Sequence, residues 1–412
     1  MPAPIVVVGG GLAAARAVAT LQDEGHDGDV VVLTSERHCP YERPPLSKDY
    51  LRGEAARSAL YPLPEEWYGR HGVDLRPGTA ALGLHPGDHT VTLSDGSTLR
   101  YSQLLLATGS TPRHLSVPGG DLRGLHYLRT IDDADHLAGM LLPAALEGGD
   151  PVAVVGDGWI GLEVAASARE LGLDVTLLGR GSHPLGNVVG PELGEVFARL
   201  HEQRGVRVHR RAPVTAFTHS EGQVTGVVTA DGTHVEAAVV VVGIGAVPAI
   251  GLAAAAGLEL RPAAQGGGVA VDGTLRTSHP DVFAAGDIAS VPSPQFGRPL
   301  RHEHWAGADT TGTHAARAML GAGDPYDVLP YFFTDQYDLG MEAVGWVEGP
   351  GGYDDVVVSG SLDDREAVAF WRRGGAVQMA MALNTWDRMP DAEALVRSRR
   401  VVPREELEAF RG

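Results

Sequence analysis

Short apolar runs followed by glycine turns recur along the chain and predict buried strands. Ile5 to Val8 and Val152 to Val155 contain only apolar residues, as strands buried on both faces of a parallel sheet do. Each run leads into glycines and a predicted helix, and a second apolar strand follows at Val30 to Leu33 and at Val175 to Leu178. This repetition of strand, turn, helix and strand predicts an α/β fold with two Rossmann-like dinucleotide-binding domains.

Three other apolar runs end in turns of small residues: Leu104 to Gly109, Val239 to Gly245 and Val282 to Asp287. The second lies in an uncharged stretch from Ala237 to Leu258 that is long enough to suggest a membrane span. Because glycines and Pro248 interrupt this stretch, we predict a buried strand, a turn and a helix instead.

The pattern changes from Asp324-Pro325 onward. Aromatic and β-branched residues there alternate with polar residues, which predicts an antiparallel sheet. The runs are Tyr331 to Phe333, Glu342 to Val347, Val356 to Ser359, Val368 to Trp371 and Val377 to Leu383. A helix is predicted from Glu393 onward. These features indicate an α+β C-terminal domain.

Composition and charge narrow the class of protein. The 412 residues are 43% apolar and 21% charged, as in ordinary soluble globular proteins. A net charge of −19 argues against nucleic acids and membranes as partners, because nucleic acids and anionic membrane surfaces would be repelled. Cys39 is the one cysteine, which excludes an intramolecular disulfide, a cysteine-ligated iron–sulfur cluster and a cysteine zinc site. No basic segment precedes the first apolar run, so we expect a cytoplasmic protein without a signal peptide.

The first glycine turn has the chemistry of a dinucleotide site. Gly9 permits a tight turn, Gly11 lets a pyrophosphate approach the backbone, and Ala14 takes the third small position. The N-terminus of the following helix adds partial positive charge for the phosphates. Glu36 ends the next strand, about 20 residues beyond the glycines, where a carboxylate accepts hydrogen bonds from a ribose.

The second glycine turn, Gly156-Asp157-Gly158-Trp159-Ile160-Gly161, has the same spacing, so two nucleotides are expected. Glu163 lies near the N-terminus of its helix, where the helix dipole favours a carboxylate. Gly179 stands where NAD-specific sites carry an acid, and Arg180 follows it. This combination favours a 2′-phosphate and hence NADPH, although the site takes either coenzyme if Arg180 only points to water.

Lys48 is the one lysine among the 33 lysine and arginine residues. A chain so biased toward arginine indicates that this position requires a compact ammonium rather than a planar guanidinium. Pro44 and Pro45 restrict the backbone that leads to it. We therefore predict a chemical role for this lysine.

The segment from Ala285 to Trp305 contains two further candidates. Ala285-Gly286-Asp287 resembles the turn in which an aspartate binds the ribityl chain of a flavin. His302, Glu303 and His304 suggest a metal site at first sight. Neighbouring side chains of an extended segment point to opposite faces, however, so we expect no metal there.

Taken together, these features resemble the FAD-dependent ferredoxin reductases of bacterial cytochrome P450 and Rieske dioxygenase systems, the putidaredoxin reductase type within the glutathione-reductase-like superfamily. The resemblance covers essentially the whole chain. Its motifs are Tyr41-Glu42-Arg43-Pro44-Pro45-Leu46-Ser47-Lys48, Ala107-Thr108-Gly109, Tyr127-Leu128-Arg129-Thr130, Ile160-Gly161-Leu162-Glu163, Ala285-Gly286-Asp287, Glu303-His304-Trp305 and Asp335-Gln336-Tyr337-Asp338. It implies an FAD-binding domain in two parts, 1–113 and 244–325, an NAD(P)-binding domain, 114–243, and a C-terminal interface domain, 326–412.

The family pattern also implies the site residues. FAD would contact Gly9, Gly11, Ala13, Ala14, Glu36, Arg43, Lys48, Ala81, Arg129, Gly286, Asp287 and Trp305. NADPH or NADH would be held by Gly156, Gly158, Gly161 and Arg180, and Lys48 would pair with Glu163 beside N5 of the flavin. The family often has tryptophan where this chain has Phe333, which leaves Trp305 and Phe333 as the aromatic path to the acceptor. The chain lacks the cysteine pair of the disulfide reductases.

The implied reaction is hydride transfer from NADPH or NADH to FAD, followed by single-electron transfers to a 2Fe–2S ferredoxin. An acidic ferredoxin would dock on a local basic patch, for which the candidates are Arg301, Arg372, Arg373 and Arg388. Two alternatives stay open. One is a rubredoxin reductase or NAD(P)H oxidase with the same cofactors. The other is a flavoprotein whose nicotinamide binding switches a protein interaction, as in the relatives of apoptosis-inducing factor.

Overall fold

The computed structural model describes residues 3–147 and 149–411. This part of the chain forms two compact units, each assembled from separate segments. Unit 1 comprises the residues up to Arg43, Ala56–Thr111 and Val247–Pro330. Unit 2 comprises Pro44–Ala55, Pro112–Ala246 and the residues from Tyr331 onward. The domain limits proposed from the sequence stay predictions.

A parallel sheet forms the centre of unit 1, with the strand order β19-β7-β1-β2-β3. All neighbouring strands run in parallel. Every residue of β1 and β2 is buried, as expected where both faces of a sheet are covered, so the two predicted strands are confirmed. The strands are β1 (Ile5–Val8), β2 (Val30–Thr34), β3 (Val73–Pro77), β7 (Gln103–Leu106) and β19 (Val282–Ala284).

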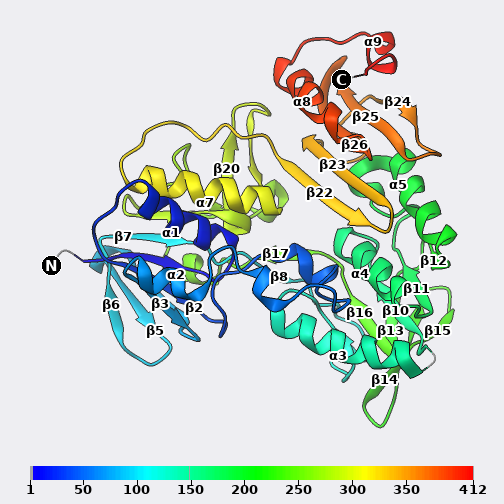
Figure 1. The fold of residues 1–412 in the computed structure, drawn as a ribbon, viewed down its shortest axis with the longest axis horizontal. Coiled ribbons are helices and arrows are strands. Elements are labelled where there is room, and N and C mark those ends of the chain that lie inside the picture. Colours follow the sequence, from blue (N-terminus) through cyan, green and yellow to red (C-terminus); the bar gives the residue numbers. More distant parts are fainter. Residues whose placement is uncertain (1–2, 148, 412) are drawn as a thin grey trace. The chain divides into compact units, whose positions relative to one another are not determined.

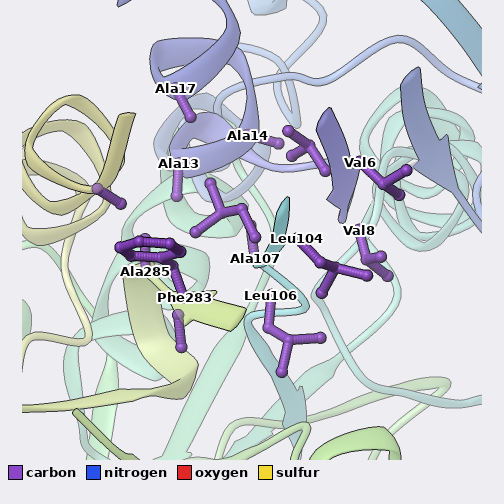
Figure 2. Close-up of a cluster of buried hydrophobic side chains, with 14 of the residues drawn as sticks. Val6, Val8, Ala13, Ala14, Ala17, Leu104, Leu106, Ala107, Phe283 and Ala285 are labelled. Atoms are coloured by element: carbon purple, nitrogen blue, oxygen red, sulfur yellow. The ribbon is translucent and has the colours of Figure 1, made fainter. Parts of the chain in front are cut away.

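Helices α1 (Leu12–Asp23) and α7 (Trp305–Met319) lie side by side in unit 1 (Figure 1). They approach closely because small residues face each other: a Cβ on Gly312 would come within 2.4 Å of the Ala13 carbonyl oxygen. Figure 2 shows the apolar core beside α1, where its alanines meet side chains of β1, β7 and β19. The predicted helix after Trp305 is confirmed and ends one residue before the expected Leu320.

The rest of unit 1 consists of short helices and two small sheets. One sheet, β4-β5-β6, is antiparallel, and the other has the order β18-β20-β21. The elements are α2 (Glu65–Arg70), α6 (Gly251–Ala255), β4 (Ala81–His85), β5 (Thr90–Leu93), β6 (Thr98–Arg100), β18 (Val269–Ala270), β20 (Ala289–Ser293) and β21 (Arg298–Arg301). A further pair, β8 (Ser110–Pro112) and β17 (Ala246–Pro248), forms where the chain passes from one unit to the other.

Unit 2 contains a second parallel sheet, with the order β12-β11-β10-β16-β9. The strands β10, β11 and β16 are buried along their whole length, so the second predicted Rossmann-like unit is confirmed. The elements are β9 (Leu125–His126), α3 (Ile131–Glu147), β10 (Val152–Val155), α4 (Trp159–Glu170), β11 (Val175–Leu178), α5 (Gly186–Gln203), β12 (Arg207–His209) and β16 (Val239–Val242), with an antiparallel sheet of β13 (Val214–Ser220), β14 (Gln223–Thr229) and β15 (His234–Glu236).

The predicted antiparallel C-terminal sheet is confirmed, with the order β22-β23-β26-β25-β24. Helix α8 packs on β23 and β26, and α9 packs on β24 (Figure 1). The predicted helix start at Glu393 is wrong, because α8 begins at Met389. Pro390 fits its first turn, where a backbone N–H is not needed. The elements are β22 (Tyr331–Gln336), β23 (Leu339–Gly345), β24 (Asp355–Ser361), β25 (Glu366–Arg373), β26 (Ala376–Leu383), α8 (Met389–Ser398) and α9 (Arg404–Glu408).

The C-terminal sheet and α5 are joined inside unit 2 by buried contacts. Trp371 is fully buried on β25, and its indole Nε1 donates a 3.1 Å hydrogen bond to the Val189 carbonyl oxygen. That oxygen lies beside a break in α5 at Gly190, where φ is +83° and Pro191 follows. The break exposes helix carbonyls that need another donor, and the indole supplies one.

The uncharged stretch from Ala237 to Leu258 forms β16, β17 and α6. It is therefore a buried strand, a short strand and a helix, in place of a membrane span. Throughout residues 3–147 and 149–411, every helix is too short or too polar to traverse a bilayer.

Candidate functional site

The first glycine loop forms a cradle at the N-terminus of α1. Gly9 has a φ of +148°, and a Cβ there would lie 2.1 Å from the Ala107 carbonyl oxygen, so only glycine fits. The space above Gly11 is open instead: no described atom lies within 4 Å of the position of a Cβ. Among the described residues, no side chain caps α1, so its first N–H groups face that space. These features fit a pyrophosphate.

Glu36 and Arg43 lie together beside this loop. The Arg43 guanidinium is 3.1 Å from Glu36 Oε1, and the Tyr41 hydroxyl donates a 2.5 Å hydrogen bond to Glu36 Oε2. Arg43 also donates to the Tyr41 oxygen at 2.9 Å. Each carboxylate oxygen keeps a lone pair for another donor, so Glu36 is held in place yet still able to accept a ribose hydroxyl.

Asp287 is buried in the turn after β19. Its Oδ2 accepts a 2.6 Å hydrogen bond from the Ser110 hydroxyl. The preceding residue, Gly286, has a φ of +74° and donates its N–H to Thr311 Oγ1 at 2.8 Å. A Cβ on Gly286 would lie 3.2 Å from that of Ala13. The structure thus brings Gly286, Asp287 and the start of α1 together, as the sequence predicts.

Three other predicted flavin contacts occupy different elements. Ala81 opens β4, in a separate sheet from the glycine loop, and pairs there with Leu93. Trp305 is the first residue of α7 and is half-buried. Arg129 belongs to unit 2, where its main-chain N–H donates to Asp133 Oδ2 at 3.1 Å near the start of α3. Their contacts with a flavin stay predictions.

The second glycine loop repeats the construction in unit 2. A Cβ on Gly156, whose φ is +111°, would lie 2.3 Å from the Gly243 carbonyl oxygen. A Cβ on Gly161 would lie 1.9 Å from the Gly156 oxygen, whereas above Gly158 no described atom lies within 4 Å. Helix α4 has no side-chain cap among the described residues. The loop therefore offers a second open cradle for phosphates.

The residue that follows β11 is close to an acid whose role the sequence analysis missed. Gly179 is buried and Arg180 is exposed. A Cβ on Gly179 would lie only 2.1 Å from Asp157 Oδ2. Burial raises the pKa of the Asp157 carboxyl, and the charge of Arg180 opposes this. The sequence did contain a signal for Asp157. The chain has this acid inside the glycine motif and lacks an acid at the end of the following strand.

Lys48 and Glu163 form a buried ion pair in unit 2, with Nζ 2.9 Å from Oε1 and side-chain exposures of 13% and 5%. Two hydroxyls also donate hydrogen bonds to the Glu163 carboxylate. Ser47 Oγ donates to Oε2 at 2.5 Å, and Thr334 Oγ1 donates to Oε1 at 2.6 Å. The Lys48 ammonium lies 5.6 Å from the centre of the Phe333 ring, within reach of a cation–π interaction. Lys48 and Glu163 are thus brought together as expected, and Phe333, Ser47 and Thr334 are additions to this cluster.

A chain of buried hydrogen bonds continues from Thr334. Gln336 Nε2 donates to Thr334 Oγ1 at 3.2 Å, and Gln336 Oε1 lies 2.9 Å from His201 Nε2. Burial lowers the pKa of His201 to about 4, so the imidazole is neutral at pH 7 and carries one N–H. That proton belongs on Nε2, since Gln336 Oε1 only accepts. The Tyr337 hydroxyl, 3.4 Å from Nδ1, is then the donor at the far end, and every donor points toward Glu163.

Replacing Thr334 by valine tests this chain. Thr334→Val is expected to lower the free energy of unfolding by about 1–3 kcal/mol, because Glu163 loses a charge-assisted donor and Gln336 loses its acceptor. Thr385→Val is the matched control, since Thr385 Oγ1 donates only to the neutral Ala367 carbonyl, at 3.2 Å. Chemical denaturation measures both variants, and equal losses would contradict a special role for the Glu163 contact.

His302, which precedes α7, is buried against an aromatic ring. Burial lowers the pKa of His302 to about 4, so this imidazole is neutral. Its ring meets the Tyr326 ring edge to face, with 5.7 Å between centres. Among residues 3–147 and 149–411, no three His, Cys, Asp or Glu side chains are grouped so as to hold a metal ion.

Comparisons with known proteins match nearly the whole chain. Family models for pyridine nucleotide-disulphide oxidoreductases and for a reductase C-terminal domain match residues 3–312 and 331–409. The ferredoxin–NAD(+) reductase component of the biphenyl dioxygenase system of Paraburkholderia xenovorans is 36% identical over 405 residues, which is 98% of this chain and 95% of that protein. The 5,5′-dehydrodivanillate O-demethylase ferredoxin reductase subunit of a Sphingobium species is 37% identical over 400 residues, or 96% and 94% of the two chains.

A solved structure agrees with these relatives. The crystal structure of the covalent putidaredoxin reductase–putidaredoxin complex contains a chain that matches 99% of this one, over 98% of its own length. The TM-score is 0.91 and the sequence identity is 31%. The similarity therefore includes both Rossmann-like sheets and the C-terminal antiparallel sheet.

Proposed function

Because this chain belongs to the pyridine nucleotide-disulphide oxidoreductase family, we propose that it is an FAD-dependent reductase that passes electrons from NADH or NADPH to a 2Fe–2S ferredoxin. The observation that carries the proposal is the pair of open glycine cradles, one in each unit, each at a helix N-terminus that no described side chain caps. Two such cradles suit two nucleotides. The ferredoxin reductases of Paraburkholderia and Sphingobium match along nearly their whole length. The ferredoxin would in turn pass its electrons to a cytochrome P450 or a Rieske oxygenase.

The residues of the first cradle fit FAD. Gly9, Gly11, Ala13 and Ala14 surround the N-terminus of α1 and would hold the pyrophosphate, and Glu36 would accept from the ribose. Asp287 would accept from the ribityl chain. When bound, FAD would supply the conversion of a two-electron hydride transfer into single-electron transfers.

Lys48 and its partners supply a fixed charge for this chemistry. A buried ammonium stabilises negative charge far better than an exposed one, because little water screens it. Glu163 holds the ammonium, and Ser47 and Thr334 hold Glu163. We propose that this cluster acts at the flavin and that the hydrogen bonds prevent its carboxylate from turning toward the nicotinamide.

The ferredoxin would dock through arginines. Arg301 is already paired with Glu303 at 2.6 Å, and Arg372 binds both oxygens of Asp355, at 3.0 and 2.5 Å. These partners neutralise much of their charge. The proposed patch therefore relies on the exposed Arg373 at the end of β25 and on Arg388 before α8. The cytoplasm stays the proposed location, in keeping with a chain that contains one cysteine.

Docking by charge has a measurable consequence. Arg373→Glu is expected to lower kcat/KM for ferredoxin roughly tenfold at low salt, because it replaces attraction by repulsion, and raising the ionic strength should reduce the difference. Arg100→Glu, the same charge change on exposed β6 of unit 1, is the control and should leave kcat/KM nearly unchanged. If kcat/KM depends on salt identically in the unmodified protein and in both variants, Arg373 is not part of the docking surface.

Steady-state assays test the function itself. The purified protein should be yellow and should reduce a cytochrome through a 2Fe–2S ferredoxin faster than it reduces rubredoxin or oxygen as sole acceptor. Colourless protein that cannot be loaded with FAD would overturn the proposal. If turnover is fastest with rubredoxin or oxygen, the proposed acceptor is wrong but the rest of the proposed function stands.

A further inference from the structure

The carboxylate of Asp157 occupies the place from which a side chain of residue 179 would project. An ideal Cβ on Gly179 would lie 2.1 Å from Asp157 Oδ2 and 2.6 Å from its Cγ. Any side chain at 179 would thus displace Asp157. Glycine at the strand end and aspartate in the glycine loop therefore form a complementary pair.

The main chain around this pair is held firmly. The Gly179 N–H donates to the His209 carbonyl oxygen at 2.8 Å, and the Gly179 oxygen accepts from the Ala212 N–H at 2.8 Å. The Asp157 carbonyl oxygen accepts from the Leu185 N–H at 3.0 Å. Both backbones are thus held in the arrangement in which the carboxylate lies over the C-terminal end of β11.

That end of the second strand is where dinucleotide-binding folds place the acid that accepts the hydroxyls of the adenosine ribose. Here the strand contributes no side chain, yet an acid is present because the loop after β10 supplies it. Among the described residues, the one hydrogen bond to the Asp157 carboxylate comes from its own main-chain N–H, which leaves lone pairs on its oxygens for a ligand. Burial raises the pKa of the carboxyl, in keeping with a group shielded from water, and the neighbouring charge of Arg180 favours its ionised form.

We propose that Asp157 binds the ribose hydroxyls of the pyridine coenzyme and thereby selects NADH over NADPH. The inference rests on the proposed function and reverses the preference expected from Gly179 and Arg180 alone. A 2′-phosphate would be placed against a fixed carboxylate, and like charges at short range repel strongly. The exposed Arg180 has water as an alternative partner, so it compensates only in part.

Titration calorimetry of the FAD-loaded protein with ADP-ribose and with its 2′-phosphorylated form tests the proposal without turnover. The unmodified protein should bind ADP-ribose at least about tenfold more tightly. Asp157→Asn should weaken ADP-ribose binding and bring the two dissociation constants within about threefold of each other, because the repulsion is gone. Asp174→Asn, the same change just before β11, should leave the preference intact.

A second variant keeps the carboxylate but moves it. Gly179→Ala should shift the preference in the same direction as Asp157→Asn, since its Cβ displaces Asp157 Oδ2. FAD absorbance and thermal unfolding confirm that the variants fold. Tighter binding of the phosphorylated ligand to the unmodified protein, or an unchanged preference in both variants, would overturn the role of Asp157. Binding of neither ligand would overturn the proposed function as well.

Discussion

Replacing Lys48 by alanine should slow reduction of the bound flavin by NADH or NADPH about 100-fold, while FAD remains bound. The ammonium is 13% exposed and lies 2.9 Å from Glu163 Oε1. In the proposed site, its removal would take a fixed positive charge away from the reacting atoms and would leave a carboxylate, 5% exposed, with Ser47 and Thr334 as its remaining described donors. An unpaired buried carboxylate would oppose negative charge on the reduced flavin.

Stopped-flow absorbance of the flavin band measures the rate, and the spectrum before mixing reports FAD content. Lys48→Arg is the informative companion, because it preserves the charge and changes only its shape. A planar guanidinium does not fit a site built around one compact ammonium, so this variant should also be slow. Rates equal to those of the unmodified protein in both variants would show that Lys48 has no part in the hydride step.

Replacing Gly156 by alanine should weaken coenzyme binding about 100-fold without loss of FAD. An alanine Cβ would lie 2.3 Å from the Gly243 carbonyl oxygen, at a φ of +111° that side chains rarely adopt. The loop must move by about 1 Å to relieve the clash, and misplacement of this size costs about 100-fold in a positioned site. The first cradle belongs to unit 1, so its affinity for FAD should be retained.

The variant Gly172→Ala separates the effect of backbone strain from the effect of distorting the phosphate loop. Gly172 also has a positive φ, +87°, but no described atom lies within 4 Å of a Cβ there. Both variants incur the conformational penalty, and only Gly156→Ala distorts the phosphate loop. Calorimetric titration with NAD(+) measures the coenzyme affinity of both variants. Chemical reduction of the flavin shows whether FAD is still bound. Equal weakening in the two variants would mean that the loss comes from stability rather than from the loop.

Several features of the site could be predicted because neighbours in the sequence carry them. The alternation of apolar strand, glycine turn and helix identifies both cradles, since a tight turn and an open helix N-terminus depend on a few consecutive residues. Glu36 and Arg43 are seven residues apart, and they lie together in the structure. The helix break at Gly190-Pro191 is a finding of the structure, and tertiary contacts show its use as the place where Trp371 binds the Val189 carbonyl oxygen.

The chain by itself determined the two nucleotide cradles and the antiparallel C-terminal sheet, because local backbone preferences specify them, and its composition made Lys48 a candidate. Only the tertiary structure decided which groups complete the charged cluster. Thr334 reaches Glu163 across 171 residues of sequence, and Gln336 reaches His201 across 135. It also placed the Asp157 carboxylate over Gly179. Contacts between distant segments depend on how whole sheets and helices pack, and no short pattern encodes that packing.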